Sequence, residues 1–134
     1  MLDCLNEIFT AVATDVRAKH KGVSVSGEYT RRPSEFPAVT LDEIENVTVA
    51  ELVDSSDTEK FSGVTYRLQV FSNKTGGRKS EARAIFATAD SVMLGLGFRR
   101  ITYTTTPEIY ESTIYSITAT YEAVVDRNGV LYKR

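Results

Sequence analysis

Apolar residues recur at the spacing of a helical face in two stretches of the chain, one at its N-terminus and one past its middle. The first stripe consists of Leu2, Leu5, Ile8, Phe9, Val12 and Val16. It predicts an N-terminal helix over residues 1–21, with Gly22 as its stop. The second stripe consists of Ala82, Ile85, Phe86, Ala89, Val92, Met93 and Leu96. It predicts a central helix over residues 76–97, capped at its C-terminus by Gly97.

Alternation of apolar and polar residues predicts the strands. Two short strands are expected within residues 23–29 and 36–44, and a long one within residues 64–71. The C-terminal strands occupy 98–134, and Asn128-Gly129 predicts a hairpin turn that folds a short last strand back. The order of elements predicts one α+β domain over residues 1–134. Its mostly antiparallel β-sheet would carry both α-helices on one face.

Residues 45–60 interrupt this alternation. Residues 45–59 contain no Lys or Arg, and their later acidic side chains are Glu51, Asp54, Asp57 and Glu59. This composition predicts an exposed acidic loop. Interspersed apolar residues such as Val49 and Leu52 keep a second interpretation open, an extended arm that orders against a partner.

Composition and charge narrow the class of protein. The 134 residues include 42% hydrophobic and 25% charged side chains, as expected for one globular domain. A formal net charge of −2 argues against a surface built throughout to bind nucleic-acid phosphates, although a local basic patch is compatible with it. Without an apolar run of about 20 residues or a secretory signal pattern, we expect no membrane association and synthesis in the cytosol.

The sequence contains few candidate catalytic residues. His20 is the only histidine, and the pattern places it at the end of the first helix. Cys4, the only cysteine, has no flanking base or cation to activate it and cannot form an internal disulfide. We therefore predict no enzyme activity, no catalytic residue, no cofactor and no metal site. A small enzyme whose carboxylate pair forms only on folding stays open as an alternative.

Cations cluster around the start of the central helix. The segment 74–80 carries Gly76-Gly77 between basic residues, but it lacks the spacing of a phosphate-binding P-loop. An ordinary helix start capped by Thr75 or Ser80 is the simplest interpretation. A module that binds an anion or nucleic acid is the alternative. We predict a basic patch of Lys74, Arg78, Lys79, Arg83, Arg99 and Arg100.

Three segments carry a resemblance to a known family. They are residues 70–82 (VFSNKTGGRKSEA), 96–100 (LGFRR) and 114–125 (IYSITATYEAVV). In this order they resemble the tail terminators of tailed phages and prophages, small tail-completion proteins of the neck. The similarity covers about residues 36–134 and contains no catalytic signature.

The resemblance implies a structural protein of virion assembly. Such terminators form a ring, commonly a homohexamer, that caps the tail tube and joins it to the head connector. The implied partners are copies of the chain itself, the tail tube protein and the connector protein, with DNA passing through the lumen without specific binding. The implied location is the virion neck, and the host cytoplasm during assembly. Other neck components, such as head-completion and connector proteins, are the alternative.

A closed ring needs two complementary surfaces on each subunit. We predict that the acidic arm, through Glu51, Asp54, Asp57 and Glu59, lies along the lumen or against a neighbouring ring, where it would repel DNA phosphates. We further predict that the basic patch lies at the subunit interface or on the connector-facing rim. The sequence leaves open whether the first helix packs on its own sheet or on a neighbour.

Overall fold

Helices and strands follow one another in the predicted order. The computed structural model describes residues 5–27, 35–48, 61–107, 114–126 and 131–132. The elements are α1 (Leu5–Lys19), β1 (Ser24–Ser26), β2 (Ala38–Thr48), β3 (Phe61–Ser72), α2 (Arg78–Gly95), β4 (Arg99–Pro107), β5 (Tyr115–Asp126) and β6 (Leu131–Tyr132). The strands form one sheet in the order β1-β2-β3-β5-β4, and β6 pairs with β5. All pairs are antiparallel except β1 with β2, which confirms the predicted fold class.

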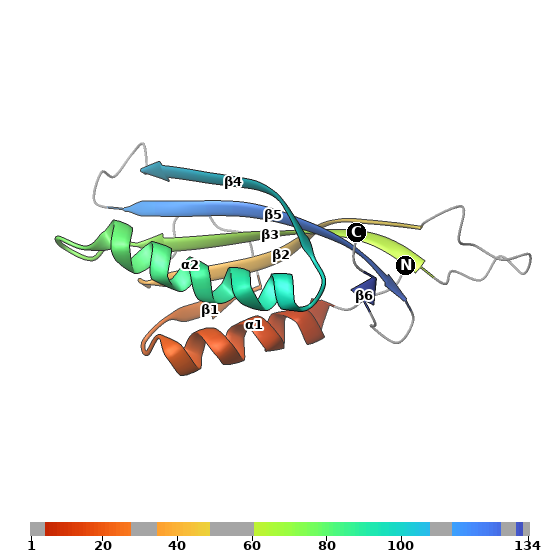
Figure 1. Cartoon of the computed structure of the whole chain (residues 1–134). Coiled ribbons are helices and arrows are strands. Elements are labelled where there is room, and N and C mark those ends of the chain that lie inside the picture. Colours follow the sequence, from red (N-terminus) through yellow and green to blue (C-terminus); the bar gives the residue numbers. More distant parts are fainter. Residues whose placement is uncertain (1–4, 28–34, 49–60, 108–113, 127–130, 133–134) are drawn as a thin grey trace, which may run out of the picture.

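The two helices lie side by side on one face of the sheet (Figure 1). Alternate residues of the long central strand, such as Tyr66 and Leu68, are fully buried in the core beneath the helices. Tyr121 and Ala119 of β5 stand opposite them in the ladder and are equally buried. Because side chains alternate across a strand, the residues between them point to the opposite, open face.

α1 packs on its own sheet. Its Ile8, Val12 and Val16 are buried in the same core as the strands and α2. At its end the His20 ring, through Nε2, is hydrogen bonded to the Thr88 hydroxyl of α2 at 2.8 Å. The part of the first apolar stripe that the structure describes, from Leu5 to Val16, therefore packs within the subunit.

Several boundaries differ from the prediction. β2 continues to Thr48, so residues 45–48, assigned to the acidic arm, are strand; the register with β3 shifts between Glu43 and Glu45. This bulge interrupts the alternation from which the strand was predicted to end at residue 44. α2 spans residues 78–95, within the predicted 76–97. β6 folds back on β5 as expected, and Asn128-Gly129 lies outside the described residues.

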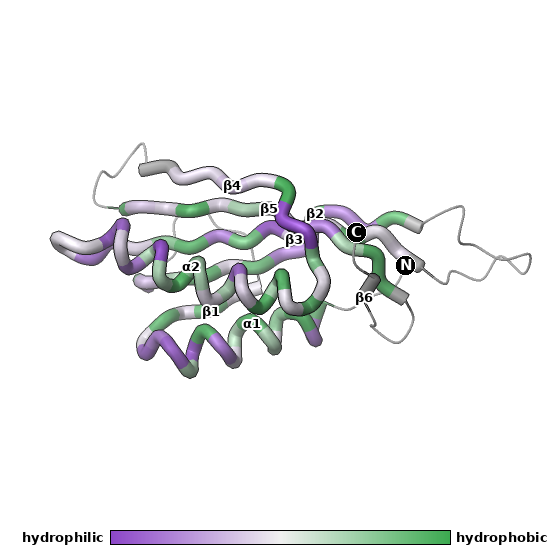
Figure 2. Tube along the Cα trace, in the orientation of Figure 1, coloured by the Kyte–Doolittle hydropathy of each residue, from purple (hydrophilic) through white to green (hydrophobic). Residues whose placement is uncertain are grey.

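The open face of the sheet is polar over much of its area. Figure 2 shows most of β4 near white, in keeping with its threonines, whereas the strands beneath the helices alternate in colour. At one end of this face a small apolar cluster forms from Ala38, Phe71 and Ile114, with Phe36 packed against it. Within the described residues, neither helix has the length and apolar character of a membrane-spanning segment.

Candidate functional site

The six residues of the predicted basic patch fall into three groups. The first group lies at the start of α2, with Lys74 in the turn after β3 and Arg78 and Lys79 as the first helical residues. Arg83, one turn further along the helix, belongs to the second group. Arg99 and Arg100 are the first two residues of β4 and point to opposite faces of the sheet, because successive residues of a strand alternate. Arg100 joins Arg83 on the helix side, whereas Arg99 is 4.0 Å from Glu122 on the open face.

A shallow hollow lies between α2 and β4. Its lining residues are Arg83, Phe86, Ala87, Asp90, Arg100 and Tyr103. The Arg100 guanidinium is 5.6 Å from the centre of the Tyr103 ring and 6.0 Å from that of Phe86, distances typical of cation–π contacts. The two rings meet edge to face with centroids 5.0 Å apart. Aromatic and arginine side chains of this kind dominate binding at protein interfaces.

A hydrogen-bond chain fixes Arg100 from below. Asp90 Oδ1 lies 3.1 Å from Arg100 Nη1 and also accepts a hydrogen bond of 2.6 Å from the hydroxyl of Tyr121. Burial, followed by the bond to Asp90, raises the pKa of the Tyr121 phenol far above its ordinary value. The phenol is therefore neutral at physiological pH and acts as a donor that orients the Asp90 carboxylate.

The glycine turn before α2 is built as a helix start. Gly76 has a φ of 75°, a left-handed conformation that favours glycine, and Gly77 is the N-cap. No side chain caps the helix, so the predicted capping by Thr75 or Ser80 is wrong. Glu81 in the first turn instead accepts a 2.6 Å hydrogen bond from the hydroxyl of Ser72. This places the chain's own carboxylate near the positive end of the helix, which weakens the case for an external anion there.

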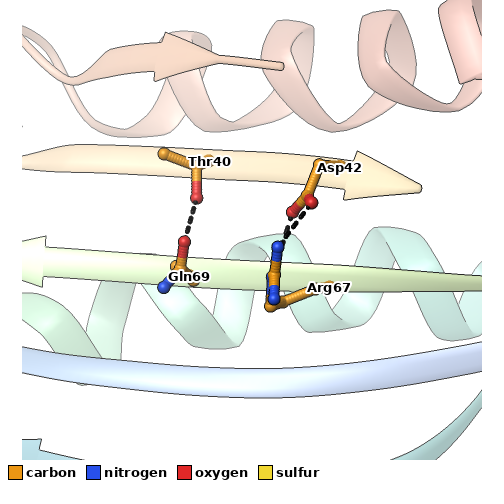
Figure 3. Close-up of polar contacts among 4 residues, drawn as sticks. All are labelled: Thr40, Asp42, Arg67 and Gln69. Atoms are coloured by element: carbon orange, nitrogen blue, oxygen red, sulfur yellow. Dashed lines mark hydrogen bonds and ion pairs between the residues drawn. The ribbon is translucent and has the colours of Figure 1, made fainter. Parts of the chain in front are cut away.

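Polar side chains on β2 and β3 pair across the open face (Figure 3). The Thr40 hydroxyl donates to Gln69 Oε1 at 2.9 Å, and both side chains are buried. One step along, Arg67 donates two bonds to the Asp42 carboxylate, at 3.2 Å from Nε and 2.7 Å from Nη2. Such a bidentate pair fixes the register of the two strands and leaves no net charge at this point of the face.

The acidic arm stays a prediction. Glu51, Asp54, Asp57 and Glu59 lie outside the described residues. β2 leads toward this segment and carries exposed residues near its end, with Ile44 at 46% and Val47 at 50% relative exposure.

Possible catalytic groups are few in the described part of the chain. His20 bonds Thr88 as a link between the two helices, and Cys4 lies outside the described residues. Among the residues that line the hollow, Asp90 is the only carboxylate, so no acid–base pair forms there. Within the described ranges, no group of three or more His, Cys, Asp or Glu side chains is placed to hold a metal ion.

Sequence reasoning missed the partners that organise the hollow. Asp90, Tyr103 and Tyr121 come from α2, β4 and β5, and only the pairing of β4 with β5 brings them together. The separation of Arg99 from Arg100 could have been predicted, because both lie in the segment 98–134 assigned to strands, and successive residues of a strand point to opposite faces.

Comparison with known proteins shows the fold. No protein-family model matches the chain, and no curated protein sequence matches it. A solved structure described as "Virion of native gene transfer agent (GTA) particle" contains a chain with the same fold, at a TM-score of 0.66 and 13% sequence identity. The match covers 92% of this chain and 94% of that chain. At this identity the similarity establishes a shared fold along nearly the whole of both chains.

Proposed function

We propose that this chain is a structural protein of a virion, and more specifically a tail terminator that caps the tail tube and joins it to the head connector. The observation that carries the proposal is the fold shared with a chain of a gene transfer agent virion over 92% of the present chain. The resemblance of residues 70–82, 96–100 and 114–125 to tail terminators supports the finer assignment.

The working form in this proposal is a ring of six copies. A ring needs a donor surface and an acceptor surface on each subunit, which face each other when copies are arranged head to tail. The hollow between α2 and β4 supplies one surface with the composition of a binding site, since it combines Arg83, Arg100 and an exposed Tyr103. The acidic segment that follows β2 supplies opposite charge.

The proposed partners are the tail tube protein on one side of the ring and the connector protein on the other. DNA passes through the lumen without specific binding, because acidic side chains repel its phosphates. In this scheme Glu51, Asp54, Asp57 and Glu59 face the lumen or an adjacent ring. The remaining cations at the start of α2, Lys74, Arg78 and Lys79, lie toward the interface or the connector-facing rim.

Size-exclusion chromatography coupled to light scattering tests the proposal, first across a concentration series and then with purified tail tubes. We expect a mass near six times the 14.9 kDa of one chain, or co-elution with the tubes. Isolated connector complexes serve as the parallel sample: binding to connectors but never to tubes would move the protein to a head-completion role. A monomer that ignores both assemblies would overturn the proposal.

A further inference from the structure

Two rows of residues cross the sheet from its β2 side to its β4 edge and end in opposite charges. The first row, given by the register of the three ladders, is Glu43, Tyr66, Tyr121 and Arg100. The next row is Glu45, Thr65, Glu122 and Arg99. Each row therefore begins with a glutamate on β2 and ends with an arginine on β4. The first row lies on the helix side of the sheet and the second on the open face.

Both edge regions are irregular at this same level. The register shifts between Glu43 and Glu45 on β2, and between Arg100 and Thr102 on β4. The residue inside each bulge is an isoleucine, and both are exposed, Ile44 at 46% and Ile101 at 44%. Each edge thus presents one exposed isoleucine beside its charged residues.

The backbone of both edges is available for pairing within the described part of the chain. β4 is the last strand of the sheet and pairs with β5 alone. β1 pairs with residues 38–40 of β2 and Gly27 lies beside the Leu41 carbonyl, so residues 42–48 have a strand partner on the β3 side only. β4 is antiparallel to β5, which runs in the same direction as β2, so β4 runs opposite to β2. A β4 strand placed beside the β2 strand of another copy would continue the antiparallel order.

We propose that subunits of the ring join edge to edge, with β4 of one copy beside residues 42–48 of β2 of the next. The inference rests on the ring of the proposed function and specifies its interface. In the proposed arrangement the rows run perpendicular to the ring axis, so cyclic symmetry brings both ends of equivalent rows of neighbouring subunits to one height. At that height Arg100 meets Glu43 of the neighbouring copy, and Arg99 meets Glu45 of that copy. Ile101 and Ile44 of the two copies then pack between the charged pairs.

The charges make the contact selective. Unpaired strand edges associate indiscriminately unless charged side chains or bulges prevent it. Arg99 and Arg100 stand on the edge strand itself, whereas their own carboxylate partners, Glu122 and Asp90, lie on β5 and α2, so two β4 edges would bring arginines together. Two β2 edges would likewise bring Glu43 and Glu45 against their equivalents. Only the head-to-tail pairing brings unlike charges together, and head-to-tail contacts are those that close into rings.

Disulfide trapping tests the proposed register. In a background in which Cys4 is replaced by Ser, the pair Glu45→Cys and Arg99→Cys is expected to give a ladder of covalent oligomers under mild oxidation. The matched control combines Glu45→Cys with Thr104→Cys. Thr104 lies on the same face of β4 as Arg99, and their β5 partners, Thr118 and Glu122, are four residues apart, which is about 14 Å along the strand. We expect the control to stay monomeric on a non-reducing gel.

Charge exchange provides a second measurement. Arg99→Glu alone and Glu45→Arg alone should each raise the concentration for half assembly by about tenfold, and the double variant should restore it. The mass and tube binding of every variant are first measured under reducing conditions. If rings form but only the Thr104 control cross-links, or if the double variant rescues nothing, the edge contact is wrong while the terminator assignment stands. If wild-type protein neither forms rings nor binds tubes, the proposed function fails and this inference fails with it.

Discussion

A single carboxylate oxygen connects three elements of the fold. Asp90 Oδ1 on α2 accepts a hydrogen bond from the Tyr121 hydroxyl of β5 and lies 3.1 Å from the Arg100 guanidinium of β4. Tyr121 is fully buried, so its hydroxyl depends on protein partners, the Asp90 carboxylate and the Arg100 guanidinium. A buried polar group without a partner costs considerably more than an exposed one. We therefore regard Tyr121 as the residue that holds the hollow in shape.

Replacing Tyr121 by Phe removes the hydroxyl and keeps the ring. We expect the free energy of unfolding to fall by about 1.5–3 kcal/mol, the usual contribution of a hydrogen bond to a charged group, as measured by chemical denaturation. Tyr115→Phe is the control, since Tyr115 is a half-buried tyrosine of the same strand that packs against the core. Equal losses for the two variants would contradict the assigned bond.

The pH dependence gives the same prediction an independent signature. The folded-state pKa of Tyr121 is raised, so above the ordinary value of 10.0 the unfolded chain releases this proton and the folded chain retains it. The unfolded state then binds fewer protons, and stability falls as pH rises through this range. The wild type should lose stability above pH 10 more steeply than Tyr121→Phe. Parallel profiles would argue against the burial of the phenol.

At this scale the sequence predicted the cations and missed what they contact. The sequence placed Arg99 and Arg100 in a basic patch. The partners of Arg100 lie on other elements, and they can be identified only when the strand pairing is known. Residues that interact within one helix or strand leave a periodic trace in the sequence. Contacts between different elements leave no such periodic pattern. Nothing in the sequence therefore distinguished Asp90 from the other acidic residues on the helices.

At the scale of elements, the end of α2 agrees closely with its prediction. Gly97 adopts a φ of 102°, and its N–H bonds the Leu94 carbonyl at 3.1 Å. The N–H of Phe98 reaches back to the Met93 carbonyl at 3.1 Å, and these two side chains are buried in the same core. Together these contacts form a Schellman motif, which turns the chain from α2 into β4.

Two glycines at this end of α2 should respond in opposite ways to alanine. Gly97→Ala places a Cβ on a left-handed residue and should lower the free energy of unfolding by about 1–2 kcal/mol. Gly95→Ala lies at the last helical position, where an added Cβ meets no atom within 4 Å. It should raise stability by up to about 1 kcal/mol, because alanine favours the helix. Thermal or urea unfolding of both variants decides the matter, and a stabilising Gly97→Ala would refute the motif.

The sequence predicts the boundary of an element well where a particular residue type ends that element. It predicts the boundary poorly where pairing with a neighbouring strand determines it. Gly97 marks the end of the helix segment because few other residues adopt its conformation. β2 gave no such signal: its bulge at Ile44 shifts the alternation by one residue, and residues 45–48 then resembled the start of a loop. The strand persists there because β3 continues beside it to Phe61.

At the scale of the whole molecule, the formal net charge of −2 conceals an uneven distribution. Lys79 and Arg83 stand four residues apart on α2, hence on one side of the helix, and Arg83 lines the hollow together with Arg100. Acidic residues dominate residues 45–59, and β2, in which this segment begins, is separated from β4 in the sheet by β3 and β5. An arrangement of this kind favours head-to-tail association, since like surfaces repel and unlike surfaces attract.

Reversing the charge of Lys79 and Arg83, which together form the α2 flank, tests this distribution. Lys79→Glu with Arg83→Glu should weaken assembly or tube binding by about tenfold or more at about 0.1 M salt. The defect should shrink toward 1 M, where the screening length falls to about 3 Å. Arg17→Glu with Lys21→Glu makes the same change in net charge at two exposed cations near the end of α1. Light scattering across a salt series compares the two: a defect independent of salt, or an equal one in the α1 variant, would show that the α2 flank does not contact an acidic surface.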